Sequence, residues 1–179
     1  MKTSFTAQVV SWMLSLTYVS VATSLSLAQQ IPKVEEDNLA GHKVVLPDAA
    51  LGNVAVLVLG FTRGSKNPTR AWAEKIGSDL GKTAGFELYS LPVLEEVPRM
   101  IRGMVIAGMK HDIPEGARSN FVPVLHNESE WKRLVNYKEP DDAYLMVLDR
   151  SGKIAYQMHG SLNDQAYNQL RQQVEPLLR

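Results

Sequence analysis

The pattern of hydrophobic and polar positions predicts a chain of alternating strands and helices. Residues 54–61 form a continuous apolar run after the turn signal Gly52-Asn53, which is typical of a strand buried on both faces. Trp72, Ile76 and Leu80 follow at the four-residue spacing of an amphipathic helix. The predicted strands span residues 43–46, 54–61, 86–91, 143–148 and 153–158, and the predicted helices span residues 67–80, 97–109, 128–135 and 162–178.

Turn and cap residues mark the ends of these elements. Asn67 and Pro68 predict the N-cap and first position of one helix. Ser161 with Asp164 resembles a capping box at the start of the last helix. Residues 149–152 (Asp-Arg-Ser-Gly) predict a hairpin turn, residues 111–120 a loop, and residues 121–125 an extended segment.

The order of the elements predicts one domain of the α/β class. A buried strand, a helix and a second strand make a βαβ unit, whose strands lie parallel with a right-handed crossover. The hairpin then adds antiparallel strands, so we expect a three-layer α/β/α sandwich with a mixed central sheet over residues 43–179. Residues 29–42 carry Pro32 and the acidic run Glu35-Glu36-Asp37, which predicts a flexible lead-in.

The first 28 residues have the layout of a secretory signal peptide. Between Lys2 and Lys33 there is no charged residue, and small residues close the segment at Ser26-Leu27-Ala28. This pattern predicts cleavage after Ala28, a periplasmic or extracellular mature chain, and no transmembrane segment after cleavage. An uncleaved membrane anchor is the alternative, although residues 3–28 are rich in Ser and Thr, which suits a membrane span poorly.

Composition excludes several classes of function. The 179 residues hold 19 basic and 19 acidic side chains, and 45% of the residues are hydrophobic. This balance is typical of a globular domain rather than of a basic protein that binds nucleic acid. The chain contains no cysteine, which excludes disulfides, thiolate chemistry and zinc–cysteine sites. It also excludes the lipid anchor of a bacterial lipoprotein, which is attached to a cysteine.

Three segments resemble the periplasmic thioredoxin-like oxidoreductases. Residues 61–70 (Phe-Thr-Arg-Gly-Ser-Lys-Asn-Pro-Thr-Arg) align without a gap with the strand end, Trp-Cys-x-Pro-Cys motif and arginine of that family. Pro68 then occupies the motif proline, and Lys66 and Thr69 occupy the two cysteine positions. Residues 147–154 resemble the family's Asp-x-x-Gly-x-Ile hairpin, and residues 39–47 resemble its opening segment. The resemblance implies a thioredoxin-like fold over most of residues 39–178.

The same alignment implies that the family's redox activity is absent. Lysine and threonine cannot replace the attacking thiolate, and Ala143 stands where the family has a cis-proline that holds the substrate. Within the superfamily, the cysteine-free first βα turn, residues 61–72 and residues 144–149 with their Gly and Ile turn resemble the assembly-factor family of the mitochondrial ATP synthase and its bacterial relatives. That resemblance implies a non-enzymatic assembly helper with a protein partner, such as a membrane complex, and without a cofactor.

The first βα turn is the predicted binding site. In open α/β sheets, ligands bind beyond the carboxyl ends of the strands, where helix N-termini offer free N–H groups. The turn could hold a carboxylate, a phosphate or an acidic loop of a partner. Two alternatives are a solvated rim without function and a non-thiol enzyme that binds a small anion. The candidate binding residues are three basic and two hydroxyl side chains: Arg63, Lys66 and Arg70, and Ser65 and Thr69.

The histidines do not predict a catalytic or metal site. His42, His111, His126 and His159 lack the spacing of metal ligands, so we interpret them as surface residues. Ser65 lies outside any Gly-x-Ser-x-Gly elbow, so we expect no nucleophile there.

The helix predicted over residues 97–109 is both apolar and basic. Its apolar side chains are predicted to lie in the core; they are Met100, Ile101, Met104, Val105 and Met109. Exposure of the methionines would instead favour a structural part of a larger complex with its binding surface away from the βα turn. Its basic side chains predict a solvated face, or a face for an acidic partner or a membrane surface; they are Arg99, Arg102 and Lys110, with Arg118 just beyond.

Overall fold

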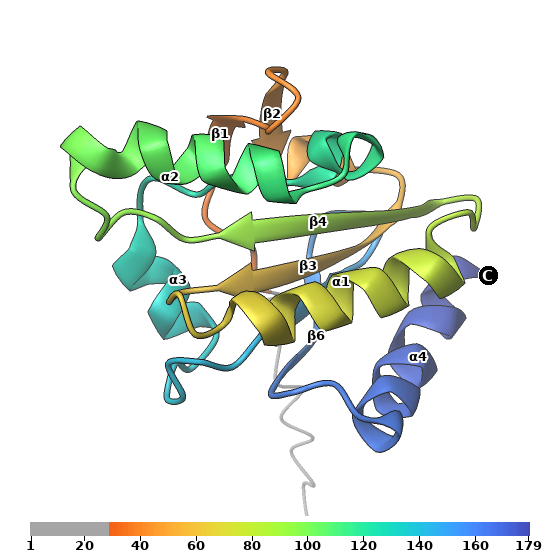
Figure 1. Cartoon of the computed structure of the whole chain (residues 1–179). Helices are drawn as coiled ribbons and strands as arrows, with labels where there is room; N and C mark the ends of the chain where they lie inside the picture. Colours follow the sequence, from red (N-terminus) through yellow and green to blue (C-terminus); the bar gives the residue numbers. More distant parts are fainter. Residues whose placement is uncertain (1–28) are drawn as a thin grey trace, which may run out of the picture.

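Strands and helices alternate along residues 29–179, the part of the chain that the computed structural model describes (Figure 1). The predicted signal peptide, residues 1–28, lies outside the described residues. The elements are β1 (Val34–Asp37), β2 (Lys43–Leu46), the 3-10 helix η1 (Asp48–Ala50), β3 (Val54–Gly60), α1 (Lys66–Leu80), β4 (Phe86–Pro92), α2 (Arg99–Asp112), the 3-10 helix η2 (Glu115–Asn120), α3 (Glu128–Leu134), β5 (Tyr144–Leu148), β6 (Ile154–His159) and α4 (Asp164–Leu178).

Four strands form the central sheet in the order β4-β3-β5-β6. β3 pairs parallel with β4 and antiparallel with β5, and β5 pairs antiparallel with β6. The predicted βαβ unit, hairpin and mixed sheet are therefore confirmed. All seven residues of β3 are buried, as its continuous apolar run predicts for a central strand covered on both faces.

Two apolar clusters cover the two faces of this sheet. Because successive side chains of a strand point to opposite faces, β3 contributes alternate residues to each cluster. On one face, Val54, Val56 and Val58 pack with α1 and α4. On the other face, Ala55, Leu57 and Leu59 pack with the β1–β2 hairpin, α3 and the segment before α3. The sheet is thus held between helices, and Figure 1 shows α1 and α4 on the same side of it.

The segment before β2 contains a strand, which differs from the flexible lead-in expected over residues 29–42. β1 pairs antiparallel with β2 in a separate two-stranded sheet. Ile31, Val34 and Leu39 are buried, whereas Glu35 and Asp37 point to solvent. An edge strand needs only one apolar face, so its outward acidic residues gave the segment the composition of a loop.

Two helix starts differ from the predicted caps. α1 begins at Lys66 after Ser65, because the preceding turn already gives Ser65 a helical backbone (φ −70°, ψ −6°). Asn67 therefore lies inside the helix. α4 is capped by Asn163, whose side chain accepts a hydrogen bond from the Ala166 N–H at 2.9 Å. That contact replaces the expected capping box of Ser161.

The helix α2 differs most from expectation, because none of its residues is fully buried. Met100 is 97% exposed, Met104 76% and Ile101 46%, so their predicted place in the core is wrong. The adjacent sheet face is already covered by the β1–β2 hairpin and α3, which leaves α2 at the margin of the molecule beyond β4 (Figure 1). No helix within residues 29–179 combines the length and apolar character that a membrane crossing needs.

Tyr89 on β4 provides a test of the core at alkaline pH. Burial, with a smaller effect of the nearby Glu87 charge, raises the pKa of Tyr89 from its ordinary value of 10.0 to about 12. A raised pKa stabilises the folded protein below pH 10, and this contribution is lost as pH rises through 12. We expect Tyr89→Phe to remove up to roughly 2 kcal/mol of the loss in stability that occurs by pH 11.5. Urea unfolding from pH 8 to pH 11.5 measures it, and parallel curves for the two proteins would contradict it.

Candidate functional site

The first βα turn connects the carboxyl end of β3 to α1 and approaches the strand closely. At Gly60, the last residue of β3, an added Cβ atom would lie 2.5 Å from Ser65 Oγ and 3.0 Å from Thr69 Cγ2. Both distances are shorter than ordinary van der Waals contact. Only a residue without a side chain fits at this position, and its small size sets the start of α1 against the strand.

The hydroxyl groups of Ser65 and Thr69 are used inside the turn. Ser65 is 2% exposed, and its hydroxyl donates to the Thr62 carbonyl at 2.8 Å. The Thr69 hydroxyl donates to the Ser65 carbonyl, also at 2.8 Å. These two residues therefore hold the shape of the turn, which differs from their expected role as donors to an external ligand.

The three basic residues of the predicted site lie at the surface around this helix end. Lys66 Nζ is 2.7 Å from Asp112 Oδ2 at the end of α2, and this ammonium group lowers the pKa of Asp112. Arg63 and Arg70 are exposed, and neither guanidinium group forms a hydrogen bond or ion pair with another residue in the range 29–179. The structure thus presents two unpaired guanidinium groups beside a lysine that links α1 to α2.

A carboxylate from a second loop lies against the same turn. Asp141 Oδ1 accepts a hydrogen bond from the Thr62 hydroxyl at 2.7 Å. A Cβ atom added to Gly64 would lie 2.1 Å from that oxygen, so the loop can approach because residue 64 is glycine. Sequence reasoning missed Asp141. The signal that could have found it is the antiparallel pairing of β3 with β5, which places Leu59 opposite Tyr144 and so brings the residues before β5 beside the turn. Ala143 lies there, fully buried.

A network that sequence reasoning also missed holds this second loop in place. Asp142 Oδ2 lies 2.8 Å from His159 Nδ1, and the His159 ring stacks on Tyr144 at a centroid distance of 5.3 Å. The Tyr144 hydroxyl accepts hydrogen bonds from the N–H groups of Lys138 and Glu139, both at 3.0 Å. Residues 138–142 are therefore fixed at the edge of the βα turn from two sides.

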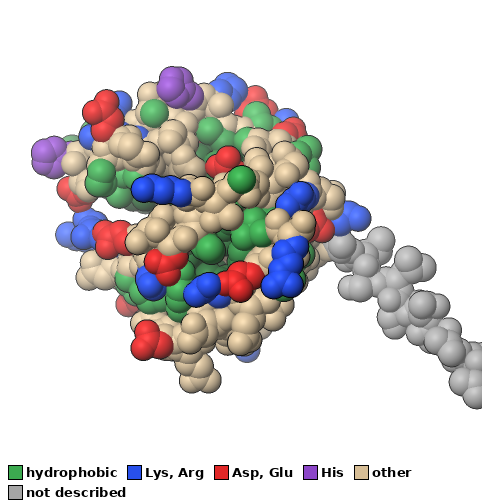
Figure 2. Space-filling view, turned by 90° about the vertical axis from the view of Figure 1, so that its right-hand side faces the viewer, with side chains coloured by type: hydrophobic (Ala, Val, Ile, Leu, Met, Phe, Trp, Pro, Cys, Tyr) green, Lys and Arg blue, Asp and Glu red, His purple; other side chains and the backbone are tan. Residues whose placement is uncertain are grey.

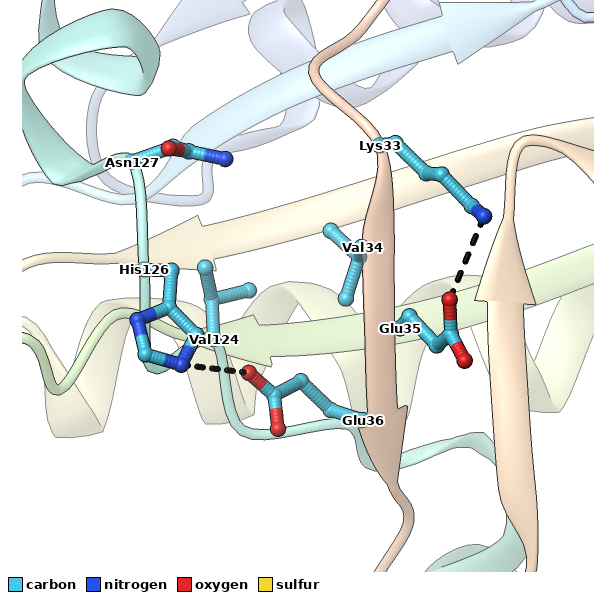
Figure 3. A pocket seen from close by; sticks show the side chains of 7 residues that line it. All are labelled: Lys33, Val34, Glu35, Glu36, Val124, His126 and Asn127. Atoms are coloured by element: carbon cyan, nitrogen blue, oxygen red, sulfur yellow. Dashed lines mark hydrogen bonds and ion pairs between the residues drawn. The ribbon is translucent and has the colours of Figure 1, made fainter.

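A shallow cavity of about 160 Å³ lies between β1 and the segment before α3 (Figure 3). Figure 3 shows Glu36 and His126 pointing toward each other, 3.8 Å apart, while Lys33 pairs with Glu35 on the other side of β1. Burial raises the pKa of Glu36, and the His126 charge opposes the shift. The cavity is lined by Lys33, Val34, Glu35, Glu36, Val124, His126 and Asn127. The charged groups that line this cavity thus lie in contact with each other.

A second charged cluster joins α3 to the segment before α2. Lys132 Nζ lies 2.7 Å from Glu128 Oε1 and 2.9 Å from Glu96 Oε1, and the two carboxylates raise the pKa of Lys132. The ammonium group also lies 5.0 Å from the ring centre of Tyr137. Because each charge has a partner, we interpret this cluster as structural. No group of three or more His, Asp or Glu within residues 29–179 is arranged to hold a metal ion.

The surface charge elsewhere is mixed. On the face drawn in Figure 2, Lys and Arg side chains lie interspersed with Asp and Glu side chains, in agreement with a formal net charge of zero. Electrostatic attraction to a partner therefore depends on local groups such as Arg63 and Arg70 rather than on the net charge of the protein.

Replacement of Gly60 tests how tightly this turn is built. We expect Gly60→Ala to destabilise the protein by roughly 1–3 kcal/mol, because the new methyl group displaces Ser65 and the first turn of α1. Urea unfolding measures the change. Gly116→Ala is the matched control, since its added Cβ atom meets nothing within 4 Å. Equal stability of the two variants would contradict this account of the turn.

Comparisons with known proteins identify the fold. No protein-family model matches the chain, and no curated protein matches it. Among solved structures, a Chlorobium tepidum chain assigned as the thiol:disulfide interchange protein DsbE superposes with a TM-score of 0.59 and 19% identity, covering 85% of this chain and 97% of that one. BsSco, a member of the Sco family of cytochrome c oxidase assembly proteins, superposes with a TM-score of 0.58 and 15% identity, covering 85% of this chain and 95% of that one.

A third solved structure agrees with these two. The pneumococcal exposed lipoprotein thioredoxin Etrx1 of Streptococcus pneumoniae gives a TM-score of 0.56 and 10% identity, covering 79% of this chain and 98% of that one. The chain therefore has a thioredoxin-like α/β fold, as the sequence predicts. It carries this fold without a cysteine, so the thiol chemistry named for DsbE is absent from its own residues.

Proposed function

We propose that this chain is a protein-binding module of the thioredoxin fold, without thiol redox activity, that acts as an assembly factor outside the cytoplasm. The observation that carries the proposal is the N-terminus of α1. The positions aligned with the two cysteines hold Lys66 and Thr69, and the exposed guanidinium groups of Arg63 and Arg70 lie near them. A surface with these groups can recognise an acidic segment of a partner by charge-assisted hydrogen bonds.

The contacts of the turn support recognition rather than chemistry at this position. The Lys66 amine is exposed and paired with Asp112, whereas a nucleophilic lysine needs an apolar pocket or a cationic neighbour that favours its neutral form. The Ser65 and Thr69 hydroxyls are held by backbone carbonyls. We therefore assign partner contact to Arg63, Lys66 and Arg70, with Ser65 and Thr69 shaping the turn that presents them.

Two of the similar structures favour the assembly role and the location. BsSco belongs to a family of cytochrome c oxidase assembly proteins, which is an example of this fold in the assembly of a membrane complex. Etrx1 is described as an exposed lipoprotein, and residues 1–28 have the pattern of a cleaved signal peptide. The sequence also predicts a relationship to the assembly factors of the ATP synthase, and this relationship is the most specific form of the assembly role that we propose.

A non-thiol enzyme or small-anion-binding protein is the competing function, and it has less support. The Asp141 carboxylate already lies against Gly64 and accepts a hydrogen bond from the Thr62 hydroxyl. A second anion at the same place would meet a negative charge at short range. A long acidic segment of a protein can instead reach Arg63 and Arg70 from outside the turn.

Native mass spectrometry of the full chain released intact from its cell envelope separates these functions. We expect a complex with one or two discrete proteins, lost when Lys66 and Arg70 are both replaced by glutamate. A small-molecule adduct without any protein, lost in the same variant, would contradict the proposed function and support anion binding.

A further inference from the structure

The outward side of α2 between Met100 and Ala107 is an exposed apolar surface with no covering residue in the part of the chain that the structure describes. Met100 and Met104 lie one turn apart, and both are largely exposed, as is Ile101 to a lesser degree. The opposite side of the helix, with Val105, Ile106 and Met109, is half-buried against the domain. α2 therefore has two apolar sides, of which the fold uses one. This arrangement is unusual for a surface helix, whose outward side is normally polar.

Small residues accompany the methionines on this outward side. Gly103 and Ala107 are one turn apart and exposed, next to Met100 and Met104. Glycine inside a helix weakens it relative to alanine, yet a Cβ atom added to Gly103 or Gly108 would meet nothing within 4 Å. The fold of this chain therefore gives no steric reason for either glycine. Small residues between larger apolar ones let another helix approach closely, whereas a lipid surface gains nothing from them.

The charges beside this surface favour an acidic occupant. Arg99 and Lys110 are eleven positions apart, close to three turns of about 3.6 residues, so they lie on one flank of α2. Gly103 lies one turn from Arg99 along that flank. Neither the Arg99 guanidinium nor the Lys110 ammonium forms a hydrogen bond or ion pair within residues 29–179.

A second copy of this chain fits the surface poorly. In an antiparallel pair of α2 helices, Arg99 of one copy would come near Lys110 of the other. Like charges at close range oppose this arrangement. In a parallel pair, the basic flank of each copy would instead face the opposite flank of the other, where Asp112 is already paired with Lys66.

We propose that the outward side of α2 is a docking surface for an acidic amphipathic helix of another protein. The apolar stripe of that helix packs on Met100 and Met104 and into the space over Gly103 and Ala107. Its acidic flank pairs with Arg99 and Lys110. This surface is separate from the five residues of the βα turn, and the inference stands whether or not that turn binds a partner.

Methionine-methyl NMR of the mature chain, residues 29–179, tests the proposal with a defined probe. The probe is a synthetic helical peptide of about 20 residues with a leucine stripe and glutamates along one flank. A second peptide with lysine in place of each glutamate is the charge control. We expect the glutamate peptide to shift the methyl signals of Met100 and Met104 and to leave that of the buried Met146 unchanged. We expect the lysine peptide to bind about tenfold or more weakly.

Replacement of Gly103 by leucine distinguishes loss of the docking surface from loss of the folded structure. Leucine is the better helix former, and the position is open, so the thermal midpoint of Gly103→Leu should rise while its affinity for the glutamate peptide falls about tenfold. The Lys66→Glu, Arg70→Glu variant should still bind the peptide, which keeps this test distinct from that of the proposed function. Equal binding of the two peptides, unchanged affinity of Gly103→Leu, or methyl shifts produced only by phosphatidylglycerol vesicles would overturn the proposal.

Discussion

Replacing Lys66 and Arg70 together by glutamate is expected to weaken partner binding by about tenfold or more, which corresponds to about 1.4 kcal/mol or more. The two positions lie one turn apart at the N-terminus of α1, and the change converts an attractive surface into a repulsive one for an acidic segment. The N-terminus of a helix also carries a partial positive charge, which the two glutamates would neutralise. Affinity for the captured partner, measured by biolayer interferometry at two salt concentrations, tests this expectation.

The folded structure should tolerate this double change. Both side chains are exposed, and the Lys66–Asp112 ion pair lies in solvent, where such pairs contribute little to stability. Lys82→Glu with Lys153→Glu is the matched control, because these exposed lysines lie after the far end of α1 and at the β5–β6 turn. If the control weakens binding as much as the α1 variant does, the effect is one of net charge, and the βα turn is not the site.

Introducing cysteine at positions 66 and 69 together is expected to give this cysteine-free chain a reversible disulfide. The positions are three residues apart in the first turn of α1, which brings their Cα atoms within the range of about 4.4–6.8 Å that a disulfide requires. A thiol at a helix N-terminus has a lowered pKa and is therefore reactive near neutral pH. We expect mild oxidation to remove both free thiols of Lys66→Cys, Thr69→Cys, and dithiothreitol to restore them.

A second cysteine pair in the same helix is the control for this experiment. Lys75→Cys with Ser78→Cys has the same spacing in an exposed part of α1, but it lacks the helix N-terminus. Its thiols should alkylate several-fold more slowly at pH 6, because thiolate content falls about tenfold for each unit that the pKa lies higher. Equal alkylation rates would show that positions 66 and 69 do not stand where the thioredoxin-like family has its cysteines.

Much of the fold could be predicted because its central elements carry strong local patterns. The apolar run of β3 and the spacing of Trp72, Ile76 and Leu80 predict buried residues, and the structure buries all of them. The short hairpin turn at residues 149–152 has its own signal, since Asp149 Oδ1 accepts hydrogen bonds from the Ser151 and Lys153 N–H groups. Such signals lie within a few residues of the feature they predict.

The position of α2 could not be predicted from its own sequence. Apolar side chains occur on both sides of this helix, and hydrophobicity alone does not say which side meets the domain. The answer depends on β1, Trp131 and the segment around Val124, which already cover the adjacent sheet face. Packing between distant segments thus placed Met100 and Met104 in solvent.

Only part of the candidate site could be predicted, because the rest also depends on packing between segments that are distant in the sequence. The basic residues near the start of α1 follow from the alignment of residues 61–70 with one motif. Asp112 and Asp141 come from segments more than forty residues away, and they reach the turn only through the path of α2 and the pairing of β3 with β5. The inward direction of the Ser65 hydroxyl depends on the backbone of the turn, which the residue types alone do not define.

Site-specific photo-crosslinking in the native envelope tests the central claim most directly. A photoreactive amino acid is placed at position 66 in one variant and at position 82, just beyond the other end of α1, in a second variant. Our account predicts one discrete cross-linked protein from position 66, absent from position 82 and lost when Arg70 is replaced by glutamate. Cross-links of equal yield from the two positions, or none from position 66, would contradict a binding module that acts through its first βα turn.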